Sequence, residues 1–115
     1  MTPEQAVALV RPSADALSRG DVARALELAP ASRCTLEDIQ RVLEGHPVAL
    51  GPFTDADYDD AMVLAFDNDQ TGEHGFDVRL DFPARNGGLG DLSLMMIVIA
   101  SNGVCRVGID DLLTP

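Results

Sequence analysis

Residues 92–110 read LSLMMIVIASNGVCRVGID and predict two strands joined by a tight turn. Asn102-Gly103 supplies the positive φ angles that a two-residue hairpin turn requires, so the strands on either side of it, 92–100 and 104–110, are expected to pair. The first strand is apolar at both sets of alternating positions except at Ser93. It is therefore predicted to be central and buried on both faces, or to meet a partner with its second face.

Alternating hydrophobicity extends back from this hairpin to His46. Further strands are expected at 48–53, 61–67 and 76–83, because clusters of Gly, Pro, Asn and Asp separate these runs. The first third of the chain has helical spacing instead. Three helices are expected there, with N-caps at Thr2, Asp21 and Thr35 and ends at about residues 19, 30 and 45, and Pro12 is expected to kink or split the first of them.

These elements predict one α+β domain over residues 1–115, with a helical part at 1–45 and a sheet at 46–113. The expected architecture has N-terminal helices packed on one face of a four- to five-stranded antiparallel sheet. A chain of 115 residues with 46% apolar residues has enough material for one hydrophobic core. The two cysteines are expected to be free thiols, Cys34 in a loop and Cys105 as a core side chain.

The chain is strongly acidic, with 19 acidic residues, 8 arginines and a formal net charge of −11. This field makes nucleic acid and anionic membranes poor partners, whereas a basic protein surface is its natural complement. The N-terminus lacks the features of a secretory signal, and no run approaches the roughly 20 apolar residues of a membrane span. We therefore expect a cytoplasmic protein.

Two connecting segments concentrate the negative charge, residues 54–60 and 67–73. The second has acidic groups at positions one and three of a calcium-type loop and glycine at six, but Val78 stands where the bidentate glutamate belongs, so no metal site is predicted. The chain also has no recognisable nucleophile, triad or cofactor motif, and no catalytic residue and no cofactor are expected. The candidate partner-binding residues are Asp55, Asp57, Tyr58, Asp59, Asp60, Asp67 and Asp69, with Tyr58 or Phe53 as a desolvated anchor.

The motifs of the C-terminal half resemble those of a family of small bacterial domains of unknown function. The resemblance rests on the alternating strand 76–82, on Gly90-Asp91-Leu92-Ser93-Leu94 and on Ile109-Asp110-Asp111-Leu112. This chain has Phe76 and Phe82 where the family frequently has tryptophan, and it ends in Leu-Thr-Pro where the family ends in His-Val-Leu. The turn after the first helix, Leu17-Ser18-Arg19-Gly20-Asp21, is similar to that of nuclear transport factor 2-like domains. The resemblance implies an architecture and no activity.

Three functions are compatible with these features. The first is a non-enzymatic binding protein, in its most specific form a bacterial immunity protein that neutralises a basic toxin through its acidic surface. The second is a nuclear transport factor 2-like pocket protein that binds or turns over a small molecule between sheet and helices, with His74, Asp77, Asp81 and Asp91 as its polar groups. The third is a homodimer formed through the second face of strand 92–100.

Overall fold

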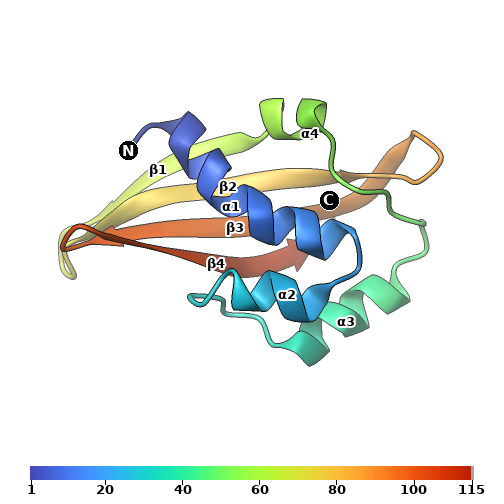
Figure 1. The fold of residues 1–115 in the computed structure, drawn as a ribbon, viewed down its shortest axis with the longest axis horizontal. Helices are drawn as coiled ribbons and strands as arrows, with labels where there is room; N and C mark the ends of the chain where they lie inside the picture. Colours follow the sequence, from blue (N-terminus) through green and yellow to red (C-terminus); the bar gives the residue numbers. More distant parts are fainter. Residues whose placement is uncertain (115) are drawn as a thin grey trace.

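The computed structural model describes residues 1–114, in which helices pack against a four-stranded antiparallel sheet (Figure 1). This is the α+β class that the sequence predicted. The helices are α1 (Pro3–Ser18), α2 (Val22–Glu27), α3 (Leu36–Gly45) and α4 (Asp55–Asp59), and the strands are β1 (Met62–Asn68), β2 (Glu73–Pro83), β3 (Leu89–Ser101) and β4 (Val104–Leu113).

Side chains that satisfy free backbone amides set the starts of the helices. The side chains of Thr2, Thr35 and Thr54 each accept a hydrogen bond from the backbone N–H of the third residue of the following helix. The side chain of that third residue accepts a hydrogen bond from the backbone N–H of the threonine. Each pair satisfies two amide donors that the helix itself cannot satisfy. α1 runs through Pro12 as one helix, so the chain is not split there.

The sheet is a meander in which each strand pairs with the next along the chain, in the order β1-β2-β3-β4. β3 is therefore central, and it pairs with β4 across the Asn102-Gly103 turn, as predicted. Both turn residues have positive φ angles, 52° at Asn102 and 77° at Gly103. A bulge at Asp110 shifts the β3–β4 register between Met95 and Met96.

α1 lies across one face of the sheet and builds the core with it (Figure 1). Its buried residues recur at the three- and four-residue spacing of a helix stripe, and they meet the even-numbered positions of β2 and β3. The innermost side chains are at most 1% exposed and include Val10, Ala14, Leu17, Val78, Leu80, Leu94 and Met96. The opposite face, here called the open face, carries the odd-numbered positions of β2 and β3, and no helix covers it in Figure 1.

Three expectations about local structure are wrong, and one of them is the connecting segment expected at residues 54–60, which instead contains the helix α4. Residues 48–53 do not form a strand, because Pro47, Gly51 and Pro52 interrupt the run, and only Leu50 makes an isolated bridge, to Ala84. The sheet accordingly has four strands and begins at residue 62.

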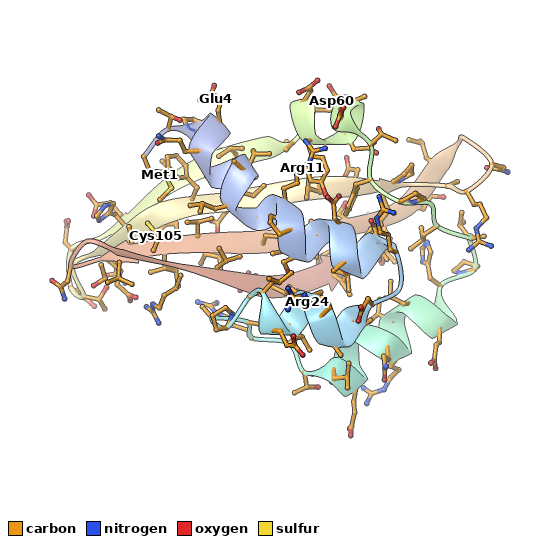
Figure 2. All side chains as sticks on the ribbon, in the orientation of Figure 1. Met1, Glu4, Arg11, Arg24, Asp60 and Cys105 are labelled. Atoms are coloured by element: carbon orange, nitrogen blue, oxygen red, sulfur yellow. The ribbon has the colours of Figure 1, made fainter. Side chains whose placement is uncertain are left out.

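The third error concerns Cys105, which is exposed instead of buried in the core. It is the second residue of β4 and lies next to the exposed turn at Asn102-Gly103 (Figure 2). Period-two alternation places a side chain on a face of the sheet, but it does not show how far along the strand that face is covered.

The two edges of the sheet differ. The segment between α2 and α3 runs along the outer edge of β4, where Ala31 N–H donates to Val107 O at 2.9 Å and Arg33 N–H donates to Ile109 O at 2.9 Å. Ile109 N–H in turn donates to Ser32 Oγ at 2.8 Å. This close approach needs glycine at 108, because a Cβ there would overlap the backbone of Ala31.

We predict that Gly108→Ala lowers the free energy of unfolding by about 1–3 kcal/mol, since the added methyl group forces the 31–33 segment away from β4. Urea denaturation measures the loss. Gly45→Ala is the matched control, because a Cβ at that position has open space around it. Equal urea midpoints for Gly108→Ala and the parent protein would show that the 31–33 segment does not depend on this glycine.

Candidate functional site

The predicted partner-binding residues fall into two clusters at the two ends of β1. Asp55, Asp57, Tyr58 and Asp59 belong to α4, and Asp60 follows directly, just before β1 begins at Met62. Asp67 is the sixth residue of β1, and Asp69 lies in the turn that leads to β2. At about 3.3 Å per residue, the clusters are separated by roughly 20 Å of strand.

Four of these carboxylates are free for a partner. Within residues 1–114, the side chains of Asp59, Asp60, Asp67 and Asp69 make no hydrogen bond and no ion pair, and all four residues are exposed. We call these four residues the acidic rim. Since these carboxylates have no partner within the described chain, an incoming cationic side chain can pair with them without breaking an existing ion pair.

Asp55 and Asp57 are instead engaged in holding α4. The Asp57 carboxylate accepts hydrogen bonds from Thr54 N–H at 2.7 Å and from Thr54 Oγ1–H at 3.0 Å, which closes the capping box. The Asp55 carboxylate pairs with the Arg11 guanidinium on α1. These two residues therefore hold α4, and with it Asp59 and Asp60, in place, and they do not add free carboxylates to the acidic rim.

Tyr58 is a core side chain that joins α4 to α1. It is 4% exposed, its ring lies 5.7 Å from that of Phe53, and its hydroxyl donates to Asp15 at 2.5 Å. The Arg11 guanidinium lies 4.3 Å from the ring centroid. Burial, together with the bond to Asp15, raises the pKa of Tyr58. Since Phe53 is only 6% exposed as well, neither aromatic ring stands free on the surface as an anchor.

The outer edge of β1 is the feature that sequence reasoning missed. Its residues 62–67 bond to β2 alone within the described chain, in contrast to the covered edge of β4. Met62 is 55% exposed and Leu64 is 60% exposed. The available signal was the uncharged run MVLAF at 62–66, which lacks the charges and prolines that commonly protect an edge strand.

A groove of about 480 Å³ runs beside this edge, between the first half of α1 and the start of β1. Figure 2 shows Glu4 and Asp60 on this side of the molecule. The groove is lined by both apolar and polar side chains, including the carboxylates of Glu4 and Asp59, and its one arginine, Arg11, is already paired with Asp55. Its lining residues are Pro3, Glu4, Val7, Ala8, Arg11, Tyr58, Asp59, Ala61 and Val63.

The four residues considered for a small-molecule pocket do not converge. Asp77 lies on the open face in a hollow with Arg33 and Asp110, on the side of the sheet opposite α1. Asp81 accepts hydrogen bonds from Ser93 Oγ–H at 2.6 Å and from the Arg79 guanidinium at 3.2 Å. The two remaining candidates, His74 and Asp91, are exposed, and neither lines the hollow of Asp77. Asp91 lines a separate hollow with Asp81.

Two further observations on residues 1–114 concern metal ions and membrane-spanning helices. No three His, Cys, Asp or Glu side chains in this range come together in a way that could hold a metal ion. None of the helices in the same range has the length and apolar composition needed to cross a membrane. Cys34 and Cys105 are unpaired.

A family model described as a domain of unknown function, DUF7668, matches residues 14–115. The match includes the last five residues of α1, the covered edge of β4 and the whole of β1. No curated protein and no solved structure matches the chain. The similarity to nuclear transport factor 2-like domains is therefore not shown.

We predict opposite effects of neutralising two carboxylates on the open face. Burial, then the charge of Asp110, raises the pKa of Asp77 above its usual 3.8, so its charged form weakens the fold once the pH exceeds that pKa. The hydrogen bond from Ser93 lowers the pKa of Asp81, so its charged form stabilises the fold. Asp77→Asn should raise Tm at pH 7 and Asp81→Asn should lower it. The loss in free energy of unfolding for Asp81→Asn is at most about 1 kcal/mol, because Asp81 is exposed.

Thermal unfolding between pH 3 and pH 7 measures both differences. The Asp77 difference should shrink as the pH falls towards the usual value of 3.8, because the raised pKa of Asp77 lies above it. The Asp81 difference should persist down to about that value and shrink only below it, because the lowered pKa of Asp81 lies beneath it. Both variants remove one negative charge, so a general relief of repulsion would shift them in the same direction. A parallel shift of the two variants would refute the assignment of opposite environments.

Proposed function

The chain belongs to the DUF7668 family of domains of unknown function, and we propose that it is a non-enzymatic acidic protein that binds a basic protein partner. In its specific form, the proposal is that of a bacterial immunity protein that neutralises a basic toxin, such as a nuclease, inside the cytoplasm. The observation that carries it is the acidic rim, four unpaired carboxylates at both ends of the uncovered strand β1.

Electrostatics supports a basic partner over a neutral one. With a net charge of −11, the whole molecule attracts a cationic surface. The carboxylates of the acidic rim are the groups that would form ion pairs with that surface. Unpaired surface carboxylates mainly raise the rate of encounter and reject wrong partners, whereas affinity comes from apolar groups that lose water. The exposed side chains of Met62 and Leu64, between the two ends of the rim, supply such groups.

Inhibition would follow from occlusion and needs no chemistry. A toxin that acts on nucleic acid gathers Arg and Lys side chains around its substrate site. Asp59, Asp60, Asp67 and Asp69 would pair with those side chains, and the body of the domain would then block the substrate. Asp55, Asp57 and Tyr58 would contribute by fixing α4, and through it the position of Asp59 and Asp60.

A capture experiment tests the proposal. The tagged parent domain and a variant with Asp59, Asp60, Asp67 and Asp69 changed to Asn are incubated with lysate of the source cell, and retained proteins are identified by mass spectrometry. We expect a basic protein that the parent retains and the variant loses. With the purified partner, the association rate constant should fall by about tenfold or more in the variant and decline with rising salt.

The matched control neutralises four acids on the other side of the molecule, Glu27, Glu37, Glu44 and Asp111. It has the same net charge as the rim variant and should retain the partner. Co-expression of the domain with the partner should also suppress the partner's activity. If both variants bind the partner equally well, or if the partner is not basic, the rim is not the binding site and the proposal fails.

A further inference from the structure

We propose that the partner docks by strand addition, in which an extended basic segment pairs with the outer edge of β1 and lies beside the groove next to α1. This inference rests on the proposed function and specifies its binding mode. It joins three observations: the unpaired edge at residues 62–67, the groove of about 480 Å³ next to it, and the acidic groups at both ends.

The backbone supplies the first part of the recognition. In an antiparallel pair, the residues of a strand direct their N–H and C=O groups alternately to one neighbour and to the other. β1 has β2 on one side, so every second residue of 62–67 presents its donor and acceptor to solvent. An added strand satisfies this row without any change in the sheet.

Side chains on the two faces of β1 supply the second part. The added strand would direct alternate side chains to opposite faces of the sheet. One set would enter the groove between α1 and β1, against Val7, Ala8 and Val63. The other set would lie on the open face beside Leu64 and Met62, which are 60% and 55% exposed in the free protein.

Charge selects a basic segment over a second copy of this chain. Two copies of β1 paired antiparallel would bring Asp59 and Asp60 of one copy close to Asp67 and Asp69 of the other, and each copy carries a net charge of −11. Like charges across a strand pair destabilise it. A segment with an apolar centre and Arg or Lys at both ends meets a carboxylate at each end, and Glu4 and Asp59 in the groove add to the attraction.

Amide hydrogen exchange with a defined probe tests the binding mode. The probe is a synthetic ten-residue peptide with two arginines at each end and alternating valine and threonine between them. In the free domain, the outward amides within 62–67, which are every second amide along the strand, should exchange fast, and saturation with the peptide should slow them. Contact through side chains alone would not produce this period of two.

Two exposed helix positions give a matched pair of variants. Ala8→Arg places a bulky cation in the groove and should weaken binding of the probe by about tenfold or more. Ala23→Arg makes the same charge change on α2, away from β1, and should leave the affinity unchanged. A peptide with glutamate in place of arginine should not bind.

The outcomes separate this inference from the function on which it rests. Binding of the probe without slowed exchange in β1, or equal effects of Ala8→Arg and Ala23→Arg, overturns strand addition and leaves a rim-dependent basic partner in place. If the probe fails to bind but capture of the partner still depends on the rim, strand addition is likewise overturned and the basic partner remains. Slowed exchange in β1 of the concentrated free domain, with a doubled mass in solution, identifies a second copy as the occupant and also overturns it.

Discussion

The packing of α1 across the sheet is the interaction on which the other features depend. A helix of 16 residues is about 24 Å long, and its buried stripe meets the centres of β2 and β3. Because it crosses the sheet at an angle, its first half passes beside β1 without covering that strand completely, which leaves the groove (Figure 1). The same helix fixes α2, since buried Ser13 Oγ–H donates to Ala25 O at 2.8 Å.

α4 depends on this packing as well. Its short length gives it no stability of its own, and it is held by Tyr58 and Asp55, both of which bond to residues of α1. The charged groups near β1 therefore divide into two kinds. Those that contact α1 or cap α4 are structural, whereas Asp59, Asp60, Asp67 and Asp69 carry an unused interaction capacity at a fixed place in the fold.

Local signals made much of this fold predictable. Asn102-Gly103 determined a hairpin, and the Thr35 capping box marked the start of α3, because both act through neighbouring residues. Thr54-Asp55-Ala56-Asp57 carried the same capping signal, yet the acidic run was taken for a connection and α4 was missed. Residues 48–53 alternated like a strand but had no neighbouring strand to pair with beyond one bridge.

The candidate site was predictable only as a composition. The sequence showed two acidic segments on either side of an apolar run, but it could not show that β1 lies at an edge, since that depends on strand order. Nor could it show that Tyr58 points inward to Asp15, a contact between residues far apart in the chain. The covering of β4 by residues 31–33 is of the same kind, because it joins the helical part of the chain to the last strand.

The difference between the two sheet edges also limits how the molecule can assemble. A fibre built by strand pairing needs two open edges in every subunit, one to receive a neighbour and one to offer to the next. Here the segment 31–33 occupies the middle of one edge, at residues 107–109 of β4, and so obstructs the second contact that growth from β1 would need. The domain can thus expose the uncharged run 62–66 at one edge of its sheet, while the obstruction at the other edge opposes polymerisation by strand pairing.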